Sequence, residues 1–166
     1  MPGDSLDTGV MAFGDSPFTI HMVFSLDPAQ NVGKYIISAL QPVGNNKYAG
    51  FMFYCYSSNT MYLNASSSAS ITSAYFGSRI NTSGWKVNTG MQTFTLDFTY
   101  TPAPEKRAEL TLTPVRAGQS SFSRTSAYFP NSLSDATISI GGTGLINDTS
   151  KDPVSMTILE FSVTKQ

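Results

Sequence analysis

Charged side chains are scarce in this sequence. Only 13% of its 166 residues are Asp, Glu, Lys or Arg, which is about half the usual share. The formal net charge of −1 comes with no stripe of Lys and Arg, which argues against nucleic-acid binding through the phosphates. Ser, Thr, Asn and Gly fill the deficit, as in secreted binding domains, adhesins and virion proteins. The composition therefore predicts an extracellular or virion-associated protein.

Cysteine and histidine each occur once, which restricts the available chemistry. Cys55 cannot form an internal disulfide and lies in an apolar run, so we expect a small core side chain. A single Cys and a single His do not make a zinc site. A Ser-His-Asp triad would have to use His21, which lies in mid-strand between Thr19 and Val23. We interpret His21 as a hydrogen-bonded sheet histidine.

Long apolar runs and helical periodicity are also absent. No stretch approaches the roughly 20 apolar residues of a membrane span, so we expect no membrane insertion. The first five residues lack the basic and apolar regions of a signal peptide. A protein acting outside the cell would then be released by lysis or belong to a larger parent chain.

Strict alternation of apolar and polar residues is the strongest pattern that the sequence does contain. Phe94, Leu96, Phe98 and Tyr100 alternate with three threonines and Asp97, which indicates a half-buried antiparallel strand. The second arm, residues 109–113, repeats the pattern with two leucines inward. Between the arms, residues 101–107 contain two prolines and three charges, which predicts a solvated connection. Together these segments predict a long hairpin with a polar tip.

Further strands are predicted along the whole chain, separated by turn signals at intervals of roughly ten residues. Residues 18–26 alternate clearly, and residues 35–40 are apolar on both sides, as in a central strand. Other expected strands cover residues 50–56, 61–65, 136–142 and 154–163, with turns at 42–48 and 57–60. Leu159, Phe161 and Val163 are expected to share one face of the closing strand. This pattern predicts an all-β sandwich or barrel, organised as one domain over residues 1–166, with 1–16 irregular or forming an edge strand.

The order of these segments resembles the concanavalin A-like lectin/glucanase superfamily, including its laminin-G-like members. The similar segments are FTIHMVFSLDP, YIISAL, FMFYCYSSNTMYLNAS, TFTLDFTY followed by AELTLTP, TISIGG and VSMTILEFSVTKQ. Within that superfamily, KVNTGMQTFTLDFTYTPAPEKRAELTLTP and SFSRTSAYF are most similar in spacing to the lectin modules of bacterial sialidases. The resemblance implies an antiparallel two-sheet β-sandwich of jelly-roll type that binds a glycan or a cell-surface polysaccharide.

Sugar binding requires a flat aromatic ring outside the core and planar polar groups beside it. The aromatic candidates are Tyr54, Tyr56, Tyr62, Tyr75, Trp85 and Tyr128. Arg79 and Arg124 flank two Tyr-Phe pairs and could hold the carboxylate of an acidic sugar in a bidentate pair. Asn64 is a further candidate ligand. For Tyr54, whose strand is apolar on both faces, burial as in a central strand remains the alternative.

Catalytic residues, a metal site and a cofactor are not predicted. Glycoside hydrolysis needs two facing carboxylates, and none of Glu105, Glu109 and Glu160 has a carboxylate two residues further on. Calcium remains open, because Asp27 with Asn31 and Asp148 with Asp152 recur in loops without the spacing of a dedicated binding loop. The sequence therefore predicts a non-catalytic carbohydrate-binding module rather than an enzyme. The alternative is a structural or receptor-binding domain of a phage tail, virion or adhesin, forming a trimer or another homo-oligomer without binding sugar.

Overall fold

The protein is built almost entirely from β-strands. The computed structural model describes residues 6–10, 16–45, 47–70, 78–79, 85–102, 104–105, 107–115, 121–126, 136–142 and 154–166. The elements in these ranges are β1 (Leu6–Val10), β2 (Phe18–Leu26), the 3-10 helix η1 (Pro28–Asn31), β3 (Tyr35–Gly44), β4 (Lys47–Ser57), β5 (Thr60–Ser70), β6 (Ser78–Arg79), β7 (Trp85–Lys86), β8 (Gln92–Thr101), β9 (Arg107–Pro114), β10 (Phe122–Ser126), β11 (Thr137–Ile140) and β12 (Met156–Lys165).

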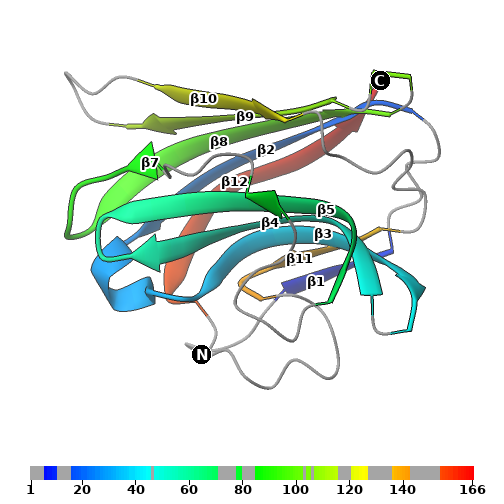
Figure 1. Cartoon of the computed structure of the whole chain (residues 1–166). Coiled ribbons are helices and arrows are strands. Elements are labelled where there is room, and N and C mark those ends of the chain that lie inside the picture. Colours follow the sequence, from blue (N-terminus) through cyan, green and yellow to red (C-terminus); the bar gives the residue numbers. More distant parts are fainter. Residues whose placement is uncertain are drawn as a thin grey trace.

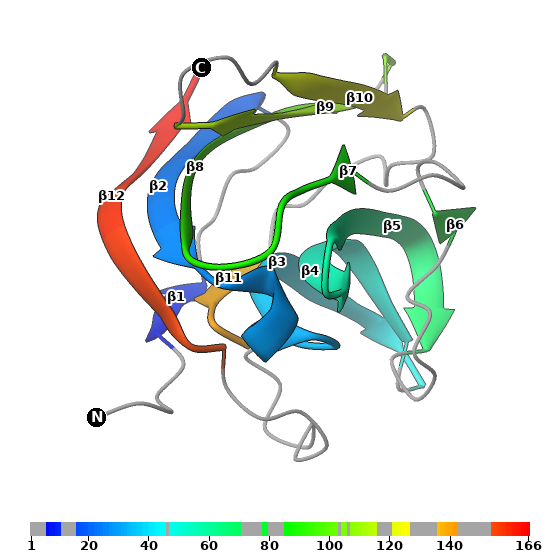
Figure 2. The same cartoon turned by 90° about the vertical axis from the view of Figure 1, so that its left-hand side faces the viewer.

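Two antiparallel sheets form the two layers of a sandwich (Figure 1). Sheet A has the order β1-β11-β3-β4-β5-β6, and β7 also pairs with β5. Sheet B has the order β10-β9-β8-β2-β12. Turned by 90°, sheet B forms an arc that bends over sheet A (Figure 2). The predicted fold class, an all-β antiparallel sandwich of jelly-roll type, is confirmed.

The predicted hairpin is formed by β8 and β9, in which Leu96 lies opposite Leu112. The four apolar side chains that alternate along β8 are fully buried, and those of Leu110 and Leu112 on β9 are buried with them. On its other side β8 pairs with β2, where Met22 lies opposite Leu96. The apolar residues that alternate in the sequence therefore face the core, and the polar residues between them face outward.

The main core lies between the two sheets. Sheet B contributes the inward residues of β2, β8 and β9, and sheet A those of β3, β4, β5 and β11. The ring of Phe98 on β8 stacks on the ring of Phe51 on β4, with centroids 3.9 Å apart. This contact joins the two layers directly.

Three features differ from the sequence-based expectation. The closing strand β12 contains an irregularity between Ile158 and Glu160 that shifts its register against β2. A bulge of this kind changes which side chains face the core, so Leu159 is 56% exposed while Phe161 and Val163 pack against the core. The expected turn at 42–48 is shorter, because β3 runs to Gly44 and Asn45 takes the positive φ of the turn. Residues 122–126, for which no strand was predicted, form β10 beside β9.

The N-terminal strand lies at the edge of sheet A. β1 pairs with β11, with Leu6 opposite Ile140. The sequence predicted that residues 1–16 are irregular or form an edge strand, and β1 lies at the edge of its sheet, whereas residues 1–5 and 11–15 lie outside the described part of the chain.

The single thiol belongs to the main core. Cys55 is fully buried, and this burial, with a smaller contribution from Asp27, raises the pKa of its thiol from 9.0 to about 12. The thiol is protonated at neutral pH and is therefore unreactive. The predicted role of Cys55 as a core side chain is confirmed.

This pKa predicts a loss of stability in alkali. The unfolded thiol loses its proton near pH 9.0 and the folded one near pH 12, so between these values the unfolded chain binds fewer protons and stability falls as pH rises. Between about pH 8 and about pH 10 we expect the free energy of unfolding to fall by about 1.4 kcal/mol more in the natural protein than in Cys55→Ala, because only the pH unit above 9.0 lies between the two pKa values. Urea titrations of both proteins at about pH 8 and about pH 10 measure the difference, since other titrating groups are shared. Equal slopes for the two proteins would contradict the prediction.

Candidate functional site

Sheet A buries apolar side chains on both of its faces. On β4, Phe51, Phe53 and Cys55 point into the main core, whereas Met52 and Tyr54 belong to a separate cluster on the opposite, outer face. This outer cluster consists of Tyr35, Leu40, Met52, Tyr54 and Tyr62, with the partly buried Tyr48 packed against it. The concentration of phenol rings makes this face the candidate site.

Three of the predicted aromatic residues lie together at one end of the outer cluster. Tyr54 lies opposite Tyr62 across β4 and β5, and their rings stack with centroids 6.2 Å apart. Tyr56 contacts both, edge-on to Tyr62 at 4.7 Å and edge-on to Tyr54 at 6.5 Å. Tyr54 and Tyr62 are 6% and 7% exposed, but Tyr56 is 44% exposed. Tyr54 thus follows the buried alternative, and Tyr56 is the ring of this group that reaches solvent.

Asn64 connects the polar part of the site to these rings. Its side-chain Nδ2 donates a hydrogen bond to the Tyr54 hydroxyl at 3.3 Å. The residue is 1% exposed, so the amide is held inside the sheet face rather than at its surface. The sequence placed Tyr54 and Asn64 in the same site, and the structure brings them into contact.

A polar rim lies at the hairpin end next to Tyr56. Lys86 Nζ donates to Thr60 Oγ1 at 3.0 Å, and Thr60 Oγ1 donates to Asn59 Oδ1 at 3.1 Å. Thr60 lies opposite Ser57, which is the residue that follows Tyr56 on β4. The hairpin end therefore presents an exposed ring with polar groups beside it.

For the remaining predicted site residues the structure describes at most the backbone position. The backbone of Arg79 pairs with Asn64 and that of Trp85 with Met61, so both residues adjoin β5, although their side chains lie outside the described part of the structure. Arg124 lies on β10 in sheet B, opposite Leu110, and so not on the sheet of the tyrosines. Tyr75 and Tyr128 fall outside the described residues. Their roles stay predictions.

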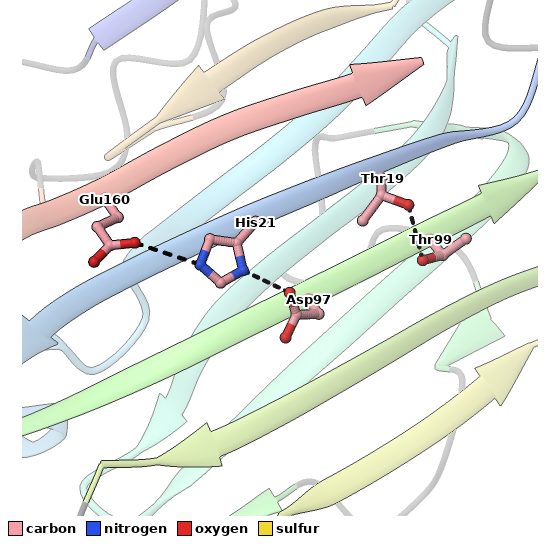
Figure 3. Close-up of polar contacts among 5 residues, drawn as sticks. All are labelled: Thr19, His21, Asp97, Thr99 and Glu160. Carbon is pink, nitrogen blue, oxygen red and sulfur yellow. Dashed lines mark hydrogen bonds and ion pairs between the residues drawn. The ribbon is translucent and has the colours of Figure 1, made fainter. Parts of the chain in front are cut away.

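The outer face of sheet B carries a second polar group. His21 Nδ1 lies 2.6 Å from Asp97 Oδ1, and His21 Nε2 lies 3.8 Å from Glu160 Oε2 (Figure 3). Beside them the Thr19 and Thr99 hydroxyls are hydrogen-bonded at 3.2 Å (Figure 3). The side chains of His21 and Asp97 are 36% and 46% exposed, so the interaction is screened by water and contributes little to stability.

The sequence analysis did not identify this second polar group, because strand register determines which of its residues become neighbours. His21 and Asp97 lie on different strands and become neighbours only when β2 and β8 pair with these residues opposite each other. Within the described residues His21 has a carboxylate on either side and no hydrogen bond to a serine. The arrangement matches a hydrogen-bonded sheet histidine.

The loop residues considered for calcium have other partners. Asp27 Oδ1 accepts hydrogen bonds from the backbone N–H groups of Ala29 and Gly90, at 2.9 and 3.1 Å. Asn31 is fully buried, donates to the carbonyls of Asp27 and Ser155, and accepts from the Ser155 N–H. Asp148 and Asp152 lie outside the described residues. Among the residues that are described, no three His, Cys, Asp or Glu side chains are grouped to hold a metal ion.

Comparisons with known proteins find similarity at the level of structure. No family model and no curated protein matches the sequence. An alginate lyase from Pseudomonas aeruginosa is similar in structure, with a TM-score of 0.47 and 7% sequence identity, over 100% of this chain and 75% of that one. At this level the likeness concerns the β-sandwich, and the substrate of that lyase is not transferred to this protein.

One sequence-based prediction has to be corrected. The chain was expected not to be an enzyme, but the similar solved chain is an enzyme, which contradicts that expectation. We therefore no longer describe the protein as non-catalytic. Separately, none of the helices in the described ranges has the length and apolar character needed to cross a membrane.

Proposed function

We propose that the protein binds a carbohydrate at the exposed end of the outer cluster, with a sugar ring stacking on Tyr56. The observation that carries this proposal is the 44% exposure of a tyrosine whose ring is held edge-on by two buried tyrosines. An exposed ring normally loses side-chain freedom when a ligand binds. Here Tyr54 and Tyr62 already restrict the ring, so less freedom remains to be lost.

The groups around Tyr56 suit a neutral, hydroxyl-rich ligand. The phenol offers an apolar ring and a polar hydroxyl on one side chain. The exposed side chains of Asn59 and Lys86 at the hairpin end, held by Thr60 between them, supply an acceptor and a donor for hydroxyl groups. Charged groups are scarce, so shape and hydrogen bonding rather than net charge would select the ligand.

Removing the Tyr56 ring tests the proposal. A glycan array with the natural protein first identifies a bound carbohydrate, and isothermal titration then gives its dissociation constant. We expect Tyr56→Ala to weaken binding by about tenfold or more, because aromatic anchors dominate binding energies. Tyr56→Phe should retain most of the affinity, because the ring remains.

Met91→Ala is the matched control, since Met91 is 74% exposed and lies outside the outer cluster. This variant should bind as the natural protein does. The proposal is wrong if no glycan binds, or if Tyr56→Ala binds as tightly as Met91→Ala. Chromatography of the same protein–glycan mixtures shows whether the bound chain is also shortened, which measures catalysis on the same ligand.

A further inference from the structure

Sheet B ends at β12, and within the described residues β2 is the one strand that pairs with it. Figure 2 shows β12 at the rim of the sheet. Most of its side chains are exposed, whereas those of β2 alternate between buried and half-buried. The far side of such a strand presents backbone N–H and C=O groups with which another strand can pair.

One hydrogen bond shows which backbone groups of β12 point away from β2. The Gln166 N–H donates to the Pro17 carbonyl at 2.8 Å. In an antiparallel pair, residues whose N–H and C=O groups point to the partner strand alternate with residues whose groups point away from it. The register of β12 against β2 is regular after its single irregularity. Counted back from Gln166, the backbone groups of Phe161, Val163 and Lys165 therefore point outward.

This edge carries little of the usual protection against pairing. Proteins protect an edge strand with proline, with charged side chains or with a bulge. β12 contains no proline, and its bulge, between Ile158 and Glu160, lies near its start. Its two charged residues, Glu160 and Lys165, lie at the ends of the regular part. We call residues 160–165 the free edge; it is about 20 Å long and uncharged between its ends.

We propose that the free edge pairs with the free edge of a second copy of this chain, so that two copies form a dimer with one continuous sheet. The two strands run antiparallel about a twofold axis at Ser162. Phe161 then lies opposite Val163 of the second copy, and Val163 opposite its Phe161. Both side chains pack against the main core and stay partly exposed in a single copy, so the pairing covers them. An axis at Val163 would instead place Phe161 opposite Lys165.

The charges of the free edge favour the antiparallel arrangement. A parallel pair in register would bring the two Glu160 side chains together, and like charges directly opposite each other destabilise a sheet. In the antiparallel pair, Glu160 of each copy lies opposite Thr164 of the other, next to its Lys165. The twofold contact also closes after two copies, whereas pairing of β12 with β10 at the other edge of sheet B would continue without end.

The contact is separate from the proposed sugar site. Tyr56 lies on β4 in sheet A, so the pairing of sheet B neither uses it nor depends on it. A dimer carries two such tyrosines, and two linked sites bind a chain with repeated units more tightly than one site does.

Two substitutions of Thr164 with opposite charge test the pairing. Thr164 is exposed, so Thr164→Lys and Thr164→Glu should both fold as the natural protein does. In the dimer each new side chain lies opposite Glu160 of the other copy, twice per dimer. Sedimentation velocity over a range of protein concentrations gives the dissociation constant of the dimer. We expect Thr164→Lys to dimerise at least about tenfold more tightly than Thr164→Glu, with the natural protein between them.

The same two substitutions at Thr95, on β8 two strands away from β12, are the matched control and should leave dimerisation unchanged. A natural protein that stays monomeric at every concentration overturns the inference, as does a trimer. Equal dimerisation of the two Thr164 variants, or the same difference between the two Thr95 variants, shows that another surface forms the dimer and overturns it too. No sugar is present in this experiment, so its failure leaves the proposed function standing, and loss of glycan binding leaves the dimer standing.

Discussion

Replacing Gly50 with alanine is expected to lower the free energy of unfolding by about 4 kcal/mol or more. Gly50 on β4 has a φ of +130°, which side-chain-bearing residues rarely adopt. A Cβ atom there would lie 1.9 Å from the carbonyl oxygen of Ala39 and 2.9 Å from its carbonyl carbon, on the neighbouring strand β3. These obstacles are backbone atoms and cannot rotate away, so β3 and β4 would have to separate where Gly50 pairs with Leu40.

Gly90→Ala separates the clash from the backbone strain. Gly90 also has a positive φ, +85°, but a Cβ atom there would meet nothing within 4 Å. Its substitution should cost only the strain of the left-handed conformation, about 1–2 kcal/mol. Urea unfolding followed by circular dichroism measures both variants. Equal destabilisation by the two substitutions would show that β3 and β4 adjust around the methyl group at little cost.

Phe98→Ala is expected to be the second most damaging change, with a loss of about 3–5 kcal/mol. Phe98 is fully buried, stacks on Phe51 of the opposite sheet and lies 6.2 Å from Phe18 between ring centroids. Truncation to alanine removes apolar area from the main core and leaves a cavity between the two layers. Rings on both sheets lose contacts, because neither backbone can close the gap without shifting a whole sheet.

Thr95→Ala is the control for Phe98→Ala, since Thr95 lies on the same strand and points to the outer face of sheet B. It should cost less than about 1 kcal/mol, the range of strand propensity. Thermal unfolding by calorimetry compares the two proteins. If Phe98→Ala unfolds within a few degrees of Thr95→Ala, the Phe51–Phe98 contact does not hold the layers together.

Much of sheet B could be predicted from the sequence because one face of the sheet is partly exposed to solvent, which produces an alternation of apolar and polar residues. Along β2 and β8, buried and half-exposed residues alternate without interruption. One exception is β12, where the irregularity between Ile158 and Glu160 moves Leu159 out of the face expected for it. A bulge depends on pairing with β2, and the apolar pattern of β12 alone does not show it.

Sheet A was harder to interpret because β4 is apolar on both faces. The sequence identified Tyr54 and Tyr56 as candidates, but not which face of β4 meets sheet B. Packing decided this, placing Phe51 and Phe53 in the main core and the tyrosines in the outer cluster. It also decided that Tyr54 is buried while Tyr56, two residues on, is exposed.

The sequence by itself determined the class of the protein: short alternating strands, broken by glycine and proline, cannot pack as helices and must pair into sheets. It also determined that tyrosines are available for a binding site and that charged side chains are few. Only the tertiary structure decided which residues meet, because strand register sets neighbours across a sheet and leaves no trace within a single strand. The pairing of His21 with Asp97 and that of Tyr54 with Tyr62 both come from that register.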